Sequence, residues 1–247
     1  MSTPSLFYRI GNQVYKYAFP LYRQIYRAFK AYTDRAERRL FRKILFPGAV
    51  VVDAGANIGI YTQFLSRYVG GAGVVHSFEP SPENFKRLRS ATRKLANVRL
   101  SQAAVGERSG RSELYLSDKL NVDHRAYAAE GDSRHTVAIE MVALDDYFEP
   151  GERVDLIKID IQGYELHALW GAERVLQENP DIQLLLEFWP FGLEQAGAKW
   201  EELIEMVRGL RMNLMLVAAN GVIPFDARDI RRDVSWYVNL FASRSRS

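Results

Sequence analysis

The sequence predicts an α/β protein built on a doubly wound, mostly parallel sheet, and its first half carries the clearest indications. An apolar strand at Val50–Val52 runs into Asp53, a glycine-containing turn and an amphipathic helix at Ile60–Tyr68. About twenty residues further on, a second apolar run, Val74–Phe78, ends at Glu79. Strand, turn, helix, strand and acid in this order form a mononucleotide-binding βαβ unit, in which ligands bind at the carboxyl ends of parallel strands.

The first turn indicates which ligand the unit binds. It reads D-x-G-x-N-x-G, which is not the G-x-G-x-x-G of dinucleotide sites, and no triphosphate-binding loop occurs in the chain. Asp53 would repel a phosphate but suits a ligand with a positive sulfonium or ammonium group, directly or through water. S-adenosylmethionine is such a ligand, with Gly55 allowing close backbone approach and Glu79 accepting both ribose hydroxyls. The alternative is that Gly55 and Gly59 serve an ordinary strand-to-helix turn.

Composition fits an enzyme with one main domain. The chain has 247 residues and no cysteine, which excludes disulfides, thiolate zinc sites and a cysteine nucleophile. No apolar run approaches the roughly 18 residues of a membrane span, and Arg9 and Lys16 interrupt the apolar positions near the N-terminus. We therefore expect a cytoplasmic protein.

Residues 1–47 form a basic, amphipathic helical extension with a break at Pro20. They hold ten lysines and arginines against Asp34 and Glu37, a net charge of +8, so the other 200 residues sum to −5. The apolar positions recur every three or four residues, and a polar set lies on another face: Ile10, Val14, Tyr17, Leu21, Ile25 and Phe29, against Arg23, Arg27, Lys30 and Asp34. The extension fits an active-site lid, contact with an anionic membrane, capture of an anionic acceptor, or simple packing with a solvated basic face.

A helix at Pro82–Leu95 and a third strand at Val98–Val105 follow the first unit. The small and polar residues near the end of this strand lie where an adenine ring would be bound. Gln102 is a candidate for the edge of the ring and Ala103 for its face. The alternative is a strand that fades into a turn.

The segment 106–141 is the least regular. Short strands at Glu113–Leu116 and Thr136–Val142 flank a polar loop with His124 and His135. Either histidine could reach an acceptor or be solvated, and their separation does not suggest a metal site.

The second informative segment begins with the apolar strand Leu156–Ile159, which ends at Asp160. Gly163 then turns the chain into a helix that bears Glu165, His167 and Trp170. Beside the first strand, this position faces the ligand in doubly wound sheets, so Asp160 is the leading catalytic carboxylate. Lys158 needs a partner in so apolar a strand, either Asp160 or Asp155. Glu165 is either an active-site residue or an acid in the first turn of the helix, where the helix dipole favours it.

The C-terminal third completes the pattern. Strand Ile182–Glu187 ends at a carboxylate and precedes Phe188, Trp189 and Pro190, whose two aromatic side chains could form a wall of an acceptor pocket. A helix at Trp200–Leu210, a hairpin of Leu214–Val217 and Val222–Pro224, and a last strand at Trp236–Phe241 follow.

These motifs, taken in order, resemble those of the FkbM-type methyltransferases. The matching segments lie between Val50 and Phe241: VVDAGANIGIYT, FEPSPENFKRL, AAVG, LDDYF, LIKIDIQGYELHALWGA and LLLEFWP. The resemblance implies a class I methyltransferase, Rossmann-like sheet of seven strands with an antiparallel last strand, over residues 48–247. It implies an S-adenosylmethionine cofactor, Asp160 near the transferred methyl, and Gln162 at a position where the family carries Glu or Gln, hence not a base. The predicted cofactor-binding residues are Asp53, Gly55, Ala56, Asn57, Gly59, Glu79, Pro80, Gln102 and Ala103.

The reaction expected from these residues is O-methylation. The chain reads DIQGY where enzymes that methylate base or glutamine amines carry [DN]-P-P-[YF], which favours a hydroxyl acceptor. Asp160 would orient it, with His124, His135 or His167 as proton acceptor, and no metal is assigned although Asp160 and Glu187 could share one. Family habit favours a sugar, glycan or other small-metabolite acceptor. The alternatives are a nucleic-acid methyltransferase using the basic N-terminus and a non-catalytic cofactor-binding protein.

Overall fold

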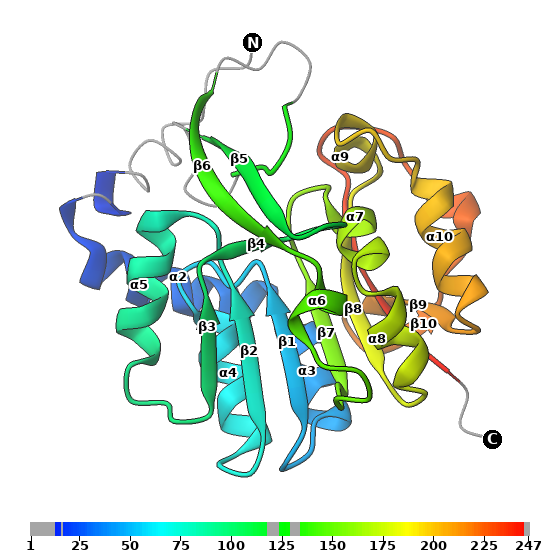
Figure 1. Ribbon diagram of the computed structural model, residues 1–247, viewed down its shortest axis with the longest axis horizontal. Coiled ribbons are helices and arrows are strands. Elements are labelled where there is room, and N and C mark those ends of the chain that lie inside the picture. Colours follow the sequence, from blue (N-terminus) through cyan, green and yellow to red (C-terminus); the bar gives the residue numbers. More distant parts are fainter. Residues whose placement is uncertain (1–12, 16, 118–123, 129–133, 245–247) are drawn as a thin grey trace.

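A central twisted sheet organises the chain (Figure 1). The computed structural model describes residues 13–15, 17–117, 124–128 and 134–244. Within them, eight strands form the main sheet in the order β10-β9-β11-β8-β7-β1-β2-β3. Their bounds are β1 Val50–Ala54, β2 Val74–Phe78, β3 Val98–Ser101, β7 Leu156–Ile159, β8 Gln183–Phe188, β9 Asn213–Ala218, β10 Gly221–Pro224 and β11 Val238–Ser243.

The strand order confirms the doubly wound prediction. Strands β1, β2, β3, β7 and β8 are parallel, and the chain leaves β1 toward β2 and later returns to its other side as β7. This switch point is where ligands bind in open α/β sheets. The last strand, β11, is antiparallel to both neighbours, as expected. One further strand, β10, extends the expected seven at the edge beside β9.

A second, smaller sheet corrects the prediction of one third strand over 98–105. The chain breaks at Gln102, and Ala103–Val105 becomes β4 of a three-stranded sheet with β5 (Gly110–Leu116) and β6 (His135–Val142). The backbone of β4 pairs with β6, not with β2, so it leaves the main sheet. Strands β5 and β6 project beyond the carboxyl ends of the central strands (Figure 1).

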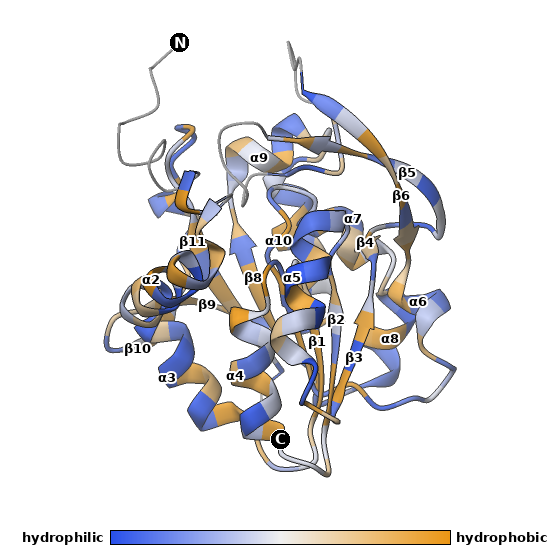
Figure 2. Ribbon diagram, turned by 90° about the vertical axis from the view of Figure 1, so that its left-hand side faces the viewer, coloured by the Kyte–Doolittle hydropathy of each residue, from blue (hydrophilic) through white to orange (hydrophobic). Residues whose placement is uncertain are grey.

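Helices cover both faces of the main sheet. Strand β1 shows the division, because Val51 packs toward α3 and α4 whereas Val52 packs toward α7, α8 and α10. The views in Figures 1 and 2 place α3 and α4 on the opposite side of the sheet from α6, α7 and α8. The helices are α2 Phe19–Thr33, α3 Arg35–Ile44, α4 Ile60–Val69, α5 Pro82–Thr92, α6 Leu144–Tyr147, α7 Glu165–Trp170, α8 Glu173–Glu178, α9 Pro190–Gln195, α10 Trp200–Gly209 and the 3₁₀ turn Ala227–Asp229.

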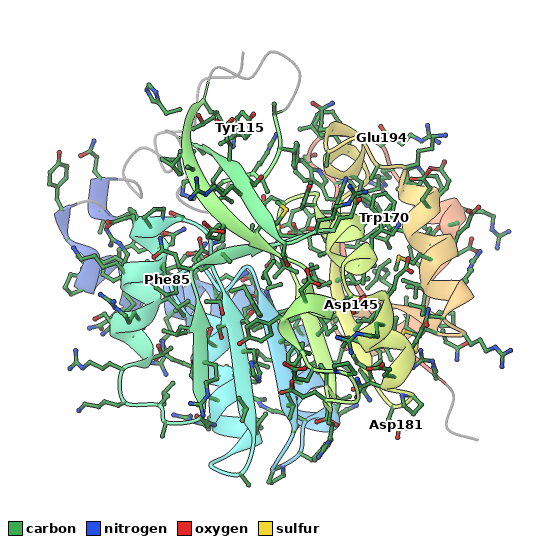
Figure 3. The ribbon with its side chains drawn as sticks, viewed as in Figure 1. Phe85, Tyr115, Asp145, Trp170, Asp181 and Glu194 are labelled. Atoms are coloured by element: carbon green, nitrogen blue, oxygen red, sulfur yellow. The ribbon has the colours of Figure 1, made fainter. Side chains whose placement is uncertain are left out.

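The LDDYF motif forms the short helix α6, which the sequence pattern did not indicate. Asp145 accepts hydrogen bonds from the backbone N–H groups of Arg174 and Val175, both at 2.9 Å. These donors lie in the first turn of α8, where they have no partner within the helix. Asp145 (labelled in Figure 3) therefore ties α6 to α8.

The N-terminal extension packs with the face opposite to the one expected. Tyr15, Phe19, Tyr22 and Tyr26 contact Ile58 and Ile60, whereas the predicted apolar positions Tyr17, Leu21, Ile25 and Phe29 are exposed. Aromatic contacts explain this packing. Arg87 lies 3.8 Å from the ring centroids of both Tyr15 and Phe19, and Tyr22 stacks on Tyr26. The helix break falls at Ala18, with Pro20 in the first turn of α2. Ile10 lies outside the described residues.

Two hydrogen bonds fasten α3 to the sheet domain. Tyr61 donates its hydroxyl to Asp34 at 2.8 Å, and Asn239 donates its amide to Glu37 at 2.6 Å. Both acids are buried. Among the described helices, none has the length and apolar character to cross a bilayer.

Candidate active site

A cavity of about 770 Å³ lies at the carboxyl ends of the central strands. The turn after β1, the segment after β2, β4, the loop after β7, the end of β8 and helix α2 all contribute to its walls. Of the predicted residues it brings together Gly55, Ala56, Asn57, Glu79, Pro80, Ala103, His124, Asp160, Glu187 and Trp189.

The turn after β1 is shaped by two left-handed residues. Gly55 has φ +81°, and a Cβ there would overlap the backbone carbonyl oxygen of Asp160, so this turn lies directly against the loop after β7. Asn57 has φ +50°, which asparagine tolerates better than most residues. Its backbone N–H donates to Glu79 at 2.8 Å, while its buried side-chain oxygen has no protein partner. This unpartnered oxygen belongs to a residue of the cavity wall, so that wall suits a ligand with polar hydrogens.

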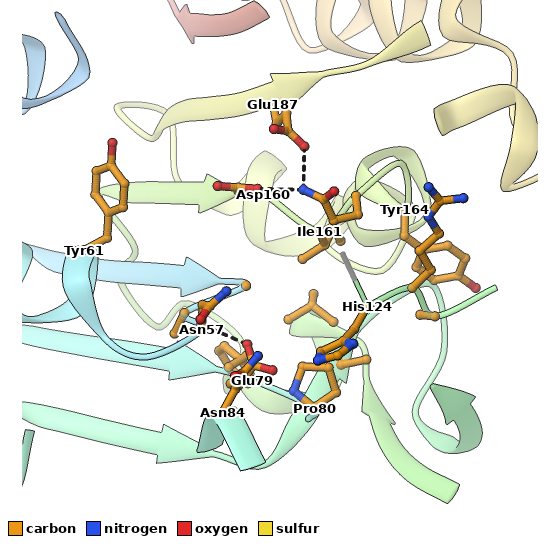
Figure 4. A pocket seen from close by; sticks show the side chains of 18 of the residues that line it. Asn57, Tyr61, Glu79, Pro80, Asn84, His124, Asp160, Ile161, Tyr164 and Glu187 are labelled. Carbon is orange, nitrogen blue, oxygen red and sulfur yellow. Dashed lines mark hydrogen bonds between the residues drawn. The ribbon is translucent and has the colours of Figure 1, made fainter. Parts of the chain in front are cut away.

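Glu79 is a buried carboxylate on the same wall (Figure 4). Its two oxygens accept the N–H groups of Asn57 and Ser81, at 2.8 and 2.9 Å. Burial raises the pKa of Glu79 to about 7. The Asn84 side chain also hydrogen-bonds this carboxylate, whose remaining acceptor capacity suits a ribose diol. The buried acid and the unpartnered Asn57 oxygen suit the polar groups of an adenosyl moiety, and their role in cofactor binding stays a prediction.

Asp53 does not reach the cavity wall. It is fully buried, accepts the Thr62 hydroxyl at 2.7 Å and lies 3.5 Å from the Lys158 ammonium. Asp53 and Lys158 are register partners on β1 and β7, which explains their pairing. The expected contact of Asp53 with a cationic ligand is therefore replaced by an internal ion pair.

Two more predicted cofactor residues lie away from the cavity. Gly59 begins α4 with φ +83°, and a Cβ there would meet the Leu88 side chain, so it permits close helix packing. Gln102 is exposed at the break between β3 and β4, because the chain leaves the main sheet there.

Asp160 and Glu187 (both labelled in Figure 4) form a carboxylate pair, and Gln162 bridges them. The Gln162 amide lies 3.1 Å from Glu187 and 3.5 Å from Asp160. Gln162 adopts φ +60°, held by the Tyr127 hydroxyl donating to its carbonyl at 2.8 Å. Burial and the Asp160 charge raise the pKa of Glu187 well above its ordinary value. Burial also acts to raise the pKa of Asp160, but the Lys158 and Lys30 charges outweigh it and lower that pKa.

Two lysines set this charge balance. Lys158 is buried and lies 3.5 Å from both Asp53 and Asp160. Burial alone would lower the pKa of Lys158, but Asp160 and Asp53 raise it above its usual value, so the side chain stays charged. It pairs with Asp160, one of the two expected partners; Asp155 instead accepts the Val50 N–H. Lys30 enters the cavity from α2 and forms an ion pair with Asp34 at 2.7 Å.

Glu165 shapes the loop that presents Asp160. Its carboxylate accepts the N–H groups of Ile161 and Gly163, at 3.0 and 3.2 Å. The side chain is fully buried, and burial raises its pKa to about 7. Glu165 therefore holds the loop after β7 by hydrogen bonds, in addition to lying in the first turn of α7.

Of the three candidate histidines, His124 lines the cavity, whereas His135 and His167 do not. The Nδ1 atom of His124 accepts the Ser117 N–H at 3.1 Å, so the neutral ring carries its proton on Nε2 and has no free lone pair for another. His167 stacks on Tyr164 with ring centroids 4.1 Å apart. No three His, Asp or Glu side chains in the described part of the chain are arranged to hold a metal ion.

The acceptor side is more aromatic than expected. Trp189 lines it, with its indole N–H donating to Val234 at 2.9 Å, whereas Phe188 and Pro190 are buried in the core. Wall residues that the sequence reasoning missed are Tyr26, Lys30, Tyr61, Tyr164 and Tyr237. The i,i+4 spacing of Lys30 and Asp34 indicated that the two charges lie on the same side of the helix, but it did not indicate that this side faces the cavity.

The strand order and the cavity at its switch point define a class I methyltransferase. The methyltransferase FkbM domain model matches residues 53–213, and the chain belongs to that family. S-adenosylmethionine is the cofactor of this family.

Similar proteins agree with this assignment. The chain is 32% identical to the 31-O-demethyl-FK506 methyltransferase FkbM of Streptomyces tacrolimicus, over 62% of this chain and 68% of the relative. It is 29% identical to "Methyltransferase 1" of Beauveria bassiana, over 50% of this chain but only 58% of that relative. The crystal structure of a methyltransferase FkbM from Methylobacillus flagellatus shares the fold, with TM-score 0.51 and 18% identity over 83% of this chain and 50% of the other.

Proposed function

We propose that the chain transfers the methyl group of S-adenosylmethionine to a hydroxyl of a small, polyhydroxylated acceptor such as a sugar, glycan unit or related metabolite. One observation carries the proposal: the Asp160–Gln162–Glu187 set and the ribose-binding candidate Glu79 face the same cavity. A donor site and a hydroxyl-orienting site within one cavity are what in-line transfer between two bound molecules needs.

The donor half of the proposal rests on Glu79, Asn57 and Gly55. S-adenosylmethionine, when bound, supplies the electrophilic methyl carbon. Glu79 would accept the ribose hydroxyls, and the unpartnered Asn57 oxygen would accept a further polar hydrogen. Gly55 keeps this turn against the Asp160 backbone, which fixes the distance between the two halves of the cavity.

The acceptor half rests on Asp160. An ionised Asp160 accepts a hydrogen bond from the acceptor hydroxyl and so points an oxygen lone pair away from itself. Because Lys158 and Lys30 lower its pKa, Asp160 is a weak base, suited to take the proton only as the new C–O bond forms. The Gln162 amide would donate to neighbouring acceptor oxygens, and Glu187 would hydrogen-bond the same part of the acceptor.

The remaining walls favour a polyhydroxylated acceptor. Trp189 offers an aromatic surface, and the Lys30 ammonium with the Tyr26 and Tyr237 hydroxyls provides donors around it. An apolar face combined with several polar groups is typical of small-ligand sites with defined orientation. The O-methylating name of the Streptomyces relative supports the hydroxyl, not a particular acceptor.

The test has a binding and a turnover step. Calorimetric titration of S-adenosylhomocysteine should show binding to the wild type and to Asp160→Asn with similar affinity, and no binding should be seen with NADH. A methyl-transfer screen of sugars, glycans and hydroxylated metabolites should then show at least about a hundredfold loss of kcat in Asp160→Asn. Asp181→Asn, an exposed surface acid far from the cavity, is the matched control. A folded wild type that does not bind S-adenosylhomocysteine would refute the proposal.

A further inference from the structure

The helical segment before α2 packs on α5 and on the start of α4. Tyr15 of this segment is buried, and its ring packs with Ile58 and Ile60. Arg87 of α5 lies 3.8 Å from the ring centroids of Tyr15 and Phe19. Arg87 also donates to the backbone carbonyl of Tyr15 at 3.1 Å. The sheet domain therefore fixes Tyr15 from two sides.

The Tyr15 hydroxyl makes a short buried contact with the first turn of α5. It donates to Oδ1 of Asn84 at 2.6 Å, although the two residues are 69 positions apart. Burial raises the pKa of Tyr15, so the hydroxyl stays protonated and remains a donor throughout the neutral range. Because the amide oxygen of Asn84 accepts this bond, the other end of the amide, Nδ2, is the end that donates elsewhere.

Asn84 lies at the cavity wall beside Glu79 (Figure 4). Its backbone N–H donates to the Ser81 hydroxyl at the start of α5, and its side chain hydrogen-bonds the Glu79 carboxylate. Burial raises the pKa of Glu79, whereas the hydrogen bonds from Ser81, Asn57 and Asn84 act to lower it. The Asn84 amide thus favours the ionised form of Glu79, which is the form that can accept both hydroxyls of a ribose.

We propose that Tyr15 is a positioning residue for cofactor binding: its hydroxyl orients the Asn84 amide, which holds the Glu79 carboxylate ready for the ribose of S-adenosylmethionine. The inference rests on Glu79 as the ribose-binding acid of the proposed function, and it is independent of the acceptor. Tyr15 lies outside the family match at residues 53–213, whereas Asn84 and Glu79 lie inside it. The N-terminal extension then acts on the donor site as well as on the fold.

A hydroxyl that only anchors the N-terminal segment predicts a different result. In that case Tyr15→Phe lowers the free energy of unfolding but leaves the cofactor affinity and its pH dependence unchanged. If the hydroxyl orients Asn84, its removal weakens the hydrogen bond to ionised Glu79 and raises the pKa of Glu79. The affinity then rises with pH over a higher range than in the wild type.

Calorimetric titration of S-adenosylhomocysteine into the full chain between pH 6 and 9 separates the two cases. Tyr15→Phe should bind about fivefold more weakly than the wild type at pH 7 and within about twofold of it at pH 9. Weakening a hydrogen bond to a charged group moves the midpoint of the affinity rise upward by about one pH unit. The matched control is Tyr17→Phe, because Tyr17 is 83% exposed in the same segment, and it should follow the wild type at every pH.

A double-variant cycle shows whether Tyr15 acts through Asn84. Asn84→Ala should bind S-adenosylhomocysteine at least about tenfold more weakly than the wild type at pH 7. Tyr15→Phe/Asn84→Ala should bind within about twofold of Asn84→Ala alone, since the hydroxyl then has no amide to orient. Urea denaturation of each variant checks that it is folded under the conditions of the titration.

Other titratable side chains lie on the elements around Glu79: Asp53 on β1, Lys158 and Asp160 at β7, His124 before β6, and Glu83 and Arg87 on α5. The Glu79→Gln background separates their titration from that of Glu79. In this background, Tyr15→Phe should leave the affinity for S-adenosylhomocysteine within about twofold at every pH.

Three results would overturn the inference while the proposed function stands. They are wild-type binding with an unshifted pH profile in Tyr15→Phe, losses that add fully in the double variant, and an equal effect of Tyr15→Phe in the Glu79→Gln background. A folded wild type that does not bind S-adenosylhomocysteine at any pH would overturn the proposed function and the inference together.

Discussion

Replacing Lys158 by methionine tests the internal ion pairs beneath the active site. The Lys158 ammonium lies 3.5 Å from Asp53 and 3.5 Å from Asp160, and its side chain is only 5% exposed. At an effective dielectric constant near 20, each contact amounts to about 5 kcal/mol of Coulomb attraction, which is largely offset by the loss of hydration. Methionine keeps most of the volume but leaves Asp53 buried without a cation.

We expect Lys158→Met to lower the free energy of unfolding by about 3 kcal/mol at pH 7.5. That value is at the low end of the roughly 3–5 kcal/mol for removing one partner of a buried pair. Asp53 retains the Thr62 hydroxyl, and the Asp160 side chain is one third exposed, so part of the lost interaction is replaced. Urea denaturation monitored by tryptophan fluorescence measures the change.

The pH dependence has a definite sign. Without the ammonium, burial raises the pKa of Asp160 in the folded variant, and such a group destabilises the fold above its unfolded pKa. The loss should therefore shrink as the pH falls from 7.5 to 5. The double variant Asp53→Asn/Lys158→Met should recover at least half of it. A loss below about 1 kcal/mol, or a double variant no more stable than the single one, would refute the reasoning.

Three further outcomes follow from individual contacts. Glu79 has a pKa of about 7 and must be ionised to accept two hydroxyls, so the affinity for S-adenosylhomocysteine should rise between pH 6 and 8. Calorimetry should show that Glu79→Gln binds it at least about tenfold more weakly and without that pH dependence. Gly55→Ala should lower the free energy of unfolding by at least about 3 kcal/mol more than Gly197→Ala, because both positions have φ +81° but only Gly55 faces backbone atoms. Equal losses in denaturant titrations would contradict the close approach of Gly55 to the Asp160 backbone. Burial raises the pKa of Glu37, and one of its oxygens has no hydrogen-bond partner. Glu37→Gln should therefore stabilise the protein by on the order of 1 kcal/mol at pH 8 and by less at pH 5, and thermal melts at both pH values measure this difference.

Local sequence signals predicted the main sheet well because each central strand is short, apolar and followed by a turn residue. Asp160 and Glu187 were placed at strand ends by position alone, and the structure brings both to the cavity. The strand predicted over 98–105 was wrong because pairing between β4 and β6 depends on residues nearly forty positions apart. Contacts of that separation leave no local signal.

The site residues that were misplaced share a physical cause. Asp53 looked like a ligand-facing acid, but it is buried 3.5 Å from the lysine opposite it on β7, and only the strand register reveals that neighbour. On α2 the hydrophobic periodicity identified an amphipathic helix correctly and its buried face wrongly. Tyr15 packs edge to face on Tyr22, and Tyr22 stacks on Tyr26, so aromatic contacts form the buried face, and tyrosine counts weakly in a hydropathy pattern.

The cavity walls come from two parts of the chain, one inside and one outside the residues that match the family model. Glu79, Asn57 and the loop after β7 lie within the matched residues 53–213, whereas Tyr26, Lys30 and Tyr237 lie outside them. Substitutions at Tyr26, Lys30 or Tyr237 would reshape the cavity wall without touching Glu79 or its hydrogen bonds. The shape of the cavity can therefore vary at these positions outside the family match while the carboxylate of Glu79 keeps its environment.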